Sequence, residues 1–113
     1  MQIHHYAQQG DLAGVAHQIA SGVDIDCLER SSSQTPLMYA VTSANAGIDM
    51  IRFLVDNGAN VNAVGGEFQD TVLSFAVRSG DLDKIRFLLD LGADIHYQRP
   101  HGYDVLIDSI HGR

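Results

Sequence analysis

The sequence has a single cysteine, no long apolar run and few basic side chains. Since Cys27 has no second cysteine to pair with, it cannot form a disulfide within the chain. No stretch approaches the roughly 20 apolar residues that a membrane-spanning helix needs. The first residues also lack the basic and apolar regions of a secretory signal. We therefore expect a cytoplasmic protein that makes no membrane contact.

Basic side chains are outnumbered by acidic ones, with 7 Lys and Arg against 14 Asp and Glu and a formal net charge of −7. A negative field repels phosphate backbones, so we expect no nucleic-acid partner. The same field favours encounter with a protein that carries a basic patch. A simpler interpretation is that the acidic side chains only keep the domain in solution. Both interpretations stay open. A length of 113 residues, 45% of them hydrophobic, fits one globular domain with a real core.

The chain repeats itself with a period close to that of one helical hairpin. Gly22, Gly58 and Gly92 follow one another at intervals of 36 and 34 residues. A second shared element, Thr-Pro-Leu at 35–37 and Thr-Val-Leu at 71–73, is also spaced by 36 residues. The two-residue discrepancy falls between Val41 and Ile48. We therefore expect an inserted pair in a turn within residues 42–45.

Each repeat has the pattern of two helices followed by an extended segment and a turn. Thr35 and Thr71 are suitable N-caps, and Pro36 fits the first helical position. The first helix should end at about Ser43 or Ser79. The second helix should bury apolar side chains at intervals of three and four residues: Ile48, Ile51, Leu54 and Val55 in one copy, and Leu82, Ile85, Leu88 and Leu89 in the next. Gly58 and Gly92 should then end it in a left-handed conformation.

The repeated motifs resemble those of the ankyrin-repeat family. Its Thr-Pro-Leu-His-x-Ala motif is matched by Thr35-Pro36-Leu37-Met38-Tyr39-Ala40, with methionine in place of histidine. The ending of its second helix is matched by Leu88-Leu89-Asp90-Leu91-Gly92-Ala93-Asp94. The resemblance implies an all-α solenoid of stacked helix-turn-helix units, about three repeats plus a partial C-terminal one. The expected units are 1–26 as an N-terminal capping repeat, 27–62 and 63–96 as repeats, and 97–113 as the partial repeat.

The two ends of this solenoid differ. His17 and Gln18 stand where later copies carry apolar pairs, which is typical of a cap whose outer face has no neighbour. At the other end, Leu106 and Ile110 begin a first helix that has no second helix after it. Three explanations stay open: a minimal cap, a piece of a longer array, or an edge covered by a partner or by a second copy.

Nothing in the sequence indicates catalysis, a cofactor or a metal. The six histidines lack the spacing of a zinc site, and His4 falls where the family has its structural histidine. Asp26 and Glu29 should raise the pKa of the Cys27 thiol, which disfavours a reactive thiolate. The serines at 31–33 have no base at a recognisable spacing, and the glycines at 65–66 are not followed by a phosphate-binding Gly-Lys.

Binding residues are therefore expected where the resemblance places the family's binding surface. On the inner row, the position after the family's histidine is occupied by His5, Tyr39, Phe75 and Asp108. Tyr39 and Phe75 could form an exposed aromatic row that binds a partner, or could pack on each other and stiffen the groove. The tips of the turns supply a second set of candidates: Glu29, Arg30, Glu67, Phe68, Tyr97, Arg99 and Tyr103.

The sequence thus predicts a non-catalytic interaction module, or scaffold, that binds another protein through its inner row and its turn tips. Two alternatives stay open. The first is a structural module that self-assembles into a homo-oligomer through the C-terminal edge. The second is a targeting fragment of a larger enzyme or effector. Because many unrelated proteins share one repeat architecture, the pattern does not name the partner.

Overall fold

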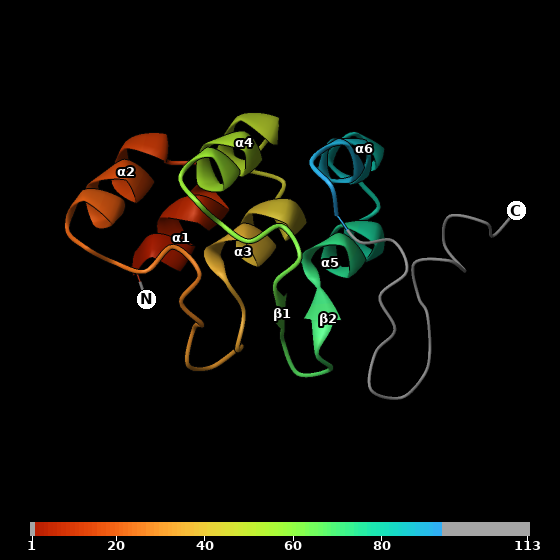
Figure 1. The fold of residues 1–113 in the computed structure, drawn as a ribbon, viewed down its shortest axis with the longest axis horizontal. Helices are drawn as coiled ribbons and strands as arrows, with labels where there is room; N and C mark the ends of the chain where they lie inside the picture. The colour runs from red at the N-terminus through yellow and green to blue at the C-terminus, as the bar shows by residue number, and fades with distance from the viewer. Residues whose placement is uncertain (1, 94–113) are drawn as a thin grey trace, which may run out of the picture.

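The computed structural model describes residues 2–93. Over this range the chain forms helices and one two-stranded hairpin: α1 (Gln2–Gln9), α2 (Leu12–Ala20), α3 (Pro36–Thr42), α4 (Ile48–Asp56), β1 (Val64–Gly65), β2 (Asp70–Thr71), α5 (Val72–Ser79) and α6 (Leu82–Asp90). Helices α1, α3 and α5 lie side by side in one layer, and α2, α4 and α6 lie over them in a second (Figure 1). The predicted stack of helical hairpins is confirmed.

The helix ends lie where their sequence signals indicate. Thr35 and Thr71 cap α3 and α5, since their side chains accept hydrogen bonds from the backbone N–H groups of Met38 and Ser74. Asp81 caps α6 in the same way. The glycines that follow α2, α4 and α6 all have positive φ, at 92°, 104° and 97° for Gly22, Gly58 and Gly92. The predicted helix boundaries are therefore confirmed.

The turn between α3 and α4 is longer than the turn between α5 and α6. Five residues, 43–47, separate α3 from α4, whereas only Gly80 and Asp81 separate α5 from α6. The additional turn is at Ala44 and Asn45, as predicted. The last two residues of this turn are Ala46 and Gly47, and α4 begins after Gly47 without a side-chain cap.

The core lies between the two layers and between neighbouring hairpins. Leu37 and Val41 of α3, Leu73 of α5, and Met50, Ile51 and Leu54 of α4 are fully buried within it. One predicted core residue is wrong, because Leu82 is 67% exposed. The physical reason is its position on α6, the last described helix, which has no described neighbour on its far side. Ile48, the matching residue on α4, is half-buried.

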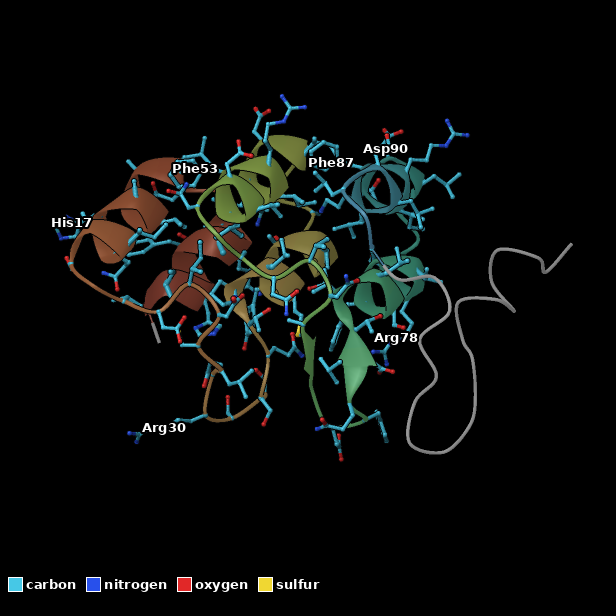
Figure 2. The ribbon with its side chains drawn as sticks, viewed as in Figure 1. His17, Arg30, Phe53, Arg78, Phe87 and Asp90 are labelled. Carbon is cyan, nitrogen blue, oxygen red and sulfur yellow. The ribbon has the colours of Figure 1, made fainter. Side chains whose placement is uncertain are left out.

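The first hairpin is the outermost described hairpin on the N-terminal side. His17 is exposed and lies on the side of α2 that faces away from α4 (Figure 2). The matching residue Phe87 of α6 instead contacts the neighbouring hairpin, because the guanidinium group of Arg52 lies 5.3 Å from its ring centre. A polar residue at position 17 therefore faces solvent in this structure where later hairpins contact each other, and the capping role of residues 1–26 stays a prediction.

The segments that follow α2 and α4 extend below the inner layer as two projecting tips (Figure 1). The second tip contains the β1–β2 hairpin, in which Val64 pairs with Thr71 and Gly65 pairs with Asp70 in antiparallel register. The predicted partial repeat at 97–113, with Leu106 and Ile110, lies outside the described residues. Within residues 2–93, every helix is too short or too polar to cross a membrane.

Candidate protein-binding surface

The inner row does not form the exposed aromatic row that we considered. His5 is exposed and Tyr39 is half-buried, but Phe75 is only 9% exposed. The ring of His4 lies beside that of Tyr39, edge-on at 5.3 Å between centres. The interpretation of Tyr39 and Phe75 as an exposed aromatic row is therefore wrong, because Phe75 is buried. Asp108 lies outside the described residues.

Phe75 is buried because the second tip folds over it. A Cβ atom on Gly66 would lie 2.7 Å from the Cζ atom of Phe75, so the backbone at this glycine crosses directly over the ring. The guanidinium group of Arg78 covers the ring at 4.9 Å and is itself paired with the buried carboxylate of Asp70. Phe75 thus supports the hairpin of the second tip and offers little surface to a partner.

Tyr39 is also used within the fold. Its hydroxyl group lies 2.8 Å from the hydroxyl oxygen of Ser32 in the first tip, within hydrogen-bonding distance. One edge of its ring packs against His4, which comes from α1. Tyr39 therefore links the inner layer to the first tip, and only part of its side chain is left for a partner.

The tip candidates that the structure describes are more accessible. Arg30 and Glu67 are exposed, and the Phe68 side chain is 52% exposed, as expected for an aromatic residue without a core role. Glu29 is half-buried, and hydrogen bonds from the backbone N–H and the hydroxyl group of Ser31 lower the pKa of its carboxyl group. The other tip candidates, Tyr97, Arg99 and Tyr103, lie outside the described residues.

An open cleft of about 500 Å³ separates the two tips; we call it the tip cleft. Its lining consists of Ser31, Ser32, Ser33, Gln34 and Glu67. The two tips are joined at its edge, because the backbone N–H of Gly66 donates a hydrogen bond of 2.7 Å to the carbonyl oxygen of Ser33. The backbones are so close that a Cβ on Gly65 would lie 2.5 Å from the same oxygen. The width of the cleft is therefore fixed by the fold.

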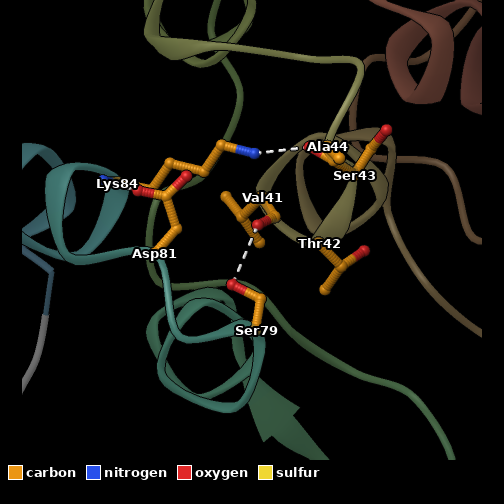
Figure 3. A pocket seen from close by; sticks show the side chains of 7 residues that line it. All are labelled: Val41, Thr42, Ser43, Ala44, Ser79, Asp81 and Lys84. Atoms are coloured by element: carbon orange, nitrogen blue, oxygen red, sulfur yellow. Dashed lines mark hydrogen bonds between the residues drawn. The ribbon is translucent and has the colours of Figure 1, made fainter.

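A second, smaller cleft of about 150 Å³ lies across the same pair of hairpins, at the C-terminal end of α3; we call it the turn cleft. Figure 3 shows its lining of Val41, Thr42, Ser43, Ala44, Ser79, Asp81 and Lys84. The Lys84 side chain is 4% exposed, and its Nζ donates hydrogen bonds to the carbonyl oxygens of Ala40 at 3.1 Å and Ser43 at 2.6 Å. Burial lowers the pKa of Lys84. This cation pairs with carbonyl groups at the end of α3 that the helix itself leaves without a donor.

Comparison with known proteins identifies the architecture. A family described as ankyrin repeats in three copies matches residues 3–99. The chain belongs to the ankyrin-repeat family. It is 36% identical to a palmitoyltransferase, AKR1, of Lachancea kluyveri over 112 residues, which cover 95% of the chain and 14% of the relative.

Two further relatives match shorter parts of this ankyrin chain. The palmitoyltransferase Hip14 of Drosophila melanogaster is 36% identical over 75 residues, 66% of the chain and 11% of that protein. The mouse protein named ankyrin repeat, SAM and basic leucine zipper domain-containing protein 1 is 43% identical over 53 residues, 47% of the chain and 10% of that protein. The chain therefore spans only about a tenth to a seventh of the length of these relatives.

His4 has the structural role that its position in the ankyrin motif implies. The side chain is buried, and its Nε2 lies 2.8 Å from the carbonyl oxygen of Cys27, so this nitrogen is the donor. Burial lowers the pKa of His4, which favours the neutral ring. The hydrogen bond ties α1 to the start of the first tip. Within residues 2–93, no group of His, Cys, Asp and Glu side chains is placed to hold a metal ion.

The Cys27 thiol has the raised pKa that the sequence predicts, but for a different main reason. Burial raises it most, and the carboxylates of Asp24 and then Asp26 add to the effect. Glu29, which the sequence suggested as a cause, instead directs its carboxylate to Ser31. A partly buried thiol with a raised pKa is a poor nucleophile.

Sequence reasoning missed two features of the binding surface. The first is Leu28, which is about half exposed in the first tip. The signal that could have identified it is the one that indicated Phe68 as a binding residue, an apolar side chain in a polar turn. The serines were interpreted only as a turn, and nothing in their spacing showed that they face Glu67 across a cleft. We define the tip surface as the side chains of Leu28, Arg30, Ser31, Ser32, Ser33, Gln34, Glu67 and Phe68.

Proposed function

We propose that this chain is a non-catalytic interaction module that binds a partner protein through the tip surface. One observation carries the proposal. Exposed apolar side chains, Leu28 and Phe68, stand on the two tips that flank an open polar cleft, while the inner aromatic residues are used within the fold. An apolar anchor beside polar groups that fix orientation is the usual composition of a protein-binding surface.

The charge of the chain supports the same proposal. With a net charge of −7, the chain attracts proteins that carry basic patches and repels nucleic acids. A stack whose tips are joined by a backbone hydrogen bond loses little conformational entropy on binding, which favours a scaffold role. We place this role in the cytoplasm, where a lone thiol such as that of Cys27 stays reduced.

A second candidate role is suggested by the relatives. Two of them are palmitoyltransferases in which the matching region is a small part of a much longer protein. The chain would then be the part of a longer protein that recruits a partner or a substrate to a catalytic region elsewhere. The mass of the native gene product in its source cell distinguishes the two, since a product far heavier than 12.3 kDa favours this second role.

Self-assembly through the C-terminal edge is the remaining candidate, and the exposed Leu82 on α6 favours it. Light scattering over a wide range of concentrations tests it. A mass that rises with concentration, and that Leu82→Ser returns to the monomer value, supports self-assembly. A monomer at every concentration rejects it.

The main proposal is tested by capture of partners on the immobilised chain from an extract of the source cell. Phe68→Ala and Leu28→Ala should weaken capture of the bound protein by about tenfold or more each if these are anchor residues. Leu12→Ala is the matched control, because Leu12 is also an exposed leucine but lies on α2, away from the tips. Equal capture by wild type and both tip variants would reject the proposal.

A further inference from the structure

The two clefts between the second and third hairpins differ in one chemical respect. In the turn cleft, buried backbone carbonyl groups at the end of α3 are met by a cation from the same chain, the Nζ of Lys84. In the tip cleft, the acceptors are the Glu67 carboxylate and the oxygen atoms of the serine and glutamine side chains. Among the described residues the Arg78–Asp70 pair is the ion pair that forms, so no described cation pairs with Glu67.

The tip cleft also has hydrogen-bonding groups that the fold does not use. The hydroxyl group of Ser33 and the side-chain amide of Gln34 make no hydrogen bond to another described residue. The neighbouring serines differ, since Ser31 bonds to Glu29 and Ser32 bonds to Tyr39. Arg30 is the nearest basic residue in sequence, but its side chain extends away from the β1–β2 hairpin (Figure 2). The cleft therefore presents hydrogen-bond acceptors that no positively charged side chain among the described residues occupies.

We propose that the tip cleft binds an arginine side chain carried by an extended segment of the partner protein. This inference rests on the proposed function and names the chemistry of its partner. A guanidinium group presents several N–H donors in one plane, so it can bond to a carboxylate on one wall and to hydroxyl or amide oxygens on the other. Glu67 and the Ser31–Gln34 segment supply those two walls.

Size and surroundings are consistent with this occupant. A cleft of about 500 Å³ that is open to solvent admits a long side chain together with part of its backbone. Phe68 follows Glu67 directly and is half exposed, so its ring is available to the partner segment outside the lining of the cleft. The joined tips hold both walls in place before binding, which lowers the entropic cost of the contact.

The test uses the full chain and two defined peptides. Acetyl-Gly-Ser-Arg-Ser-Gly-amide is titrated into the isotope-labelled chain and followed by NMR amide shifts, and the same peptide with citrulline provides a neutral probe of equal shape. We expect shifts at the amides of residues 31–34 and at Glu67, with affinity in the millimolar range, roughly that of one side-chain contact. Citrulline should bind at least about fivefold more weakly, because it lacks the charge.

Variants locate the contact. Glu67→Gln keeps the shape of an exposed side chain and should weaken the arginine peptide by at least about fivefold. Asp90→Asn is the matched control, because it changes the net charge by the same amount and removes an exposed carboxylate from α6, away from the tips. This variant should leave the affinity for the arginine peptide unchanged. The inference is overturned by equal binding of the citrulline peptide, by equal binding to Glu67→Gln, or by no tip shifts at about 10 mM peptide.

Failure of this inference is distinguishable from failure of the proposed function. If capture of the partner depends on Phe68 but the arginine peptide produces no tip shifts, the tips bind a partner by another chemistry. If the peptide binds at the cleft but capture is indifferent to Phe68 and Leu28, the cleft recognises arginine while the proposed role of the tip surface is rejected.

Discussion

The tip cleft and the turn cleft lie before and after the same helix, α3, and between the same two hairpins, yet they differ in how their polar groups are paired. In the turn cleft, Lys84 bonds to the carbonyl oxygens of Ala40 and Ser43 at the end of α3. The tip cleft is wider and presents an exposed carboxylate with unpaired polar side chains. Lys84 in the turn cleft therefore contributes to holding the stack together, whereas Ser33, Gln34 and Glu67 of the tip cleft are left for a partner.

The aromatic residues of the inner layer and of the second tip also differ in how much of their surface a partner can reach. Phe75 and Tyr39 lie on the inner layer, where the tips fold back and enclose or engage them. Phe68 lies in the loop that joins β1 to β2 and is about half exposed. The positions of these three aromatic residues in the repeat motif do not tell which side chain is exposed, because the motif alone predicts exposure for all three.

The largest effect is expected at Phe75, which supports the hairpin wall of the tip cleft. Phe75→Ala should lower the free energy of unfolding by about 3 kcal/mol, because it empties a buried site between Gly66 and Arg78. Phe68→Ala should change it by less than about 0.5 kcal/mol. Denaturant unfolding of both variants measures the contrast. Similar small losses at both positions would mean that Phe75 is not covered as described.

The next largest effect is expected in the turn cleft. Lys84→Met, which places at position 84 the residue found at the matching position 50, should lower the free energy of unfolding by about 2 kcal/mol. The variant leaves the carbonyl groups of Ala40 and Ser43 without their charged donor. Arg86→Met, at an exposed position of α6, should be nearly neutral. Equal stability of the two variants would show that the stack does not depend on Lys84.

A smaller effect is expected at His4, which holds the other wall of the tip cleft to α1. Loss of its hydrogen bond to Cys27 in His4→Leu should lower the free energy of unfolding by about 1 kcal/mol at pH 7. The pH dependence supplies a sharper readout. Because the pKa of His4 in the folded chain is below its ordinary value of 6.5, the unfolded chain takes up the proton first as the pH falls.

The stability of the wild type should therefore decrease as the pH drops from about 7 through 6.5 towards the folded pKa, and His4→Leu should lose this part of the slope. Unfolding curves at several pH values measure it, with His17→Leu as the control because His17 is exposed on α2. A slope that changes with His17 but not with His4 would contradict the assignment.

The smallest effect is expected within the tip cleft itself. Tyr39→Phe removes the hydroxyl group that lies against Ser32 and should cost about 0.5 to 1 kcal/mol of stability. Ser32→Ala should cost a similar amount, and the double variant should cost little more than either single variant, because the two changes remove one hydrogen bond. Additive losses would show that the two hydroxyl groups act independently.

Most of the fold could be predicted from the sequence because the signals are local. The N-caps at Thr35 and Thr71, the left-handed glycines and the extra turn near Ala44 all depend on residues close in the chain. Leu82 was misjudged since its burial depends on which neighbour stands beyond α6. Lys84 stands where the previous hairpin has Met50, so a charged residue at an apolar position was a visible signal, but its partners on α3 were not.

The binding surface was only partly predictable, because exposure depends on how the tips fold back. The sequence placed candidates on both the inner row and the tips, yet the crossing of Gly66 over Phe75 removes that ring from the surface. The tip cleft arises from a contact between Ser33 and Gly66, which are separated along the chain by a whole hairpin. No spacing rule within one repeat identifies such a contact.

The most direct test of the account is the footprint of a captured partner on the chain, measured as amide shifts of the labelled chain on binding. The account predicts that the changes gather in residues 28–34 and 64–69, with α2, α4 and α6 unchanged. Changes confined to those outer helices, with the tips unaffected, would contradict it.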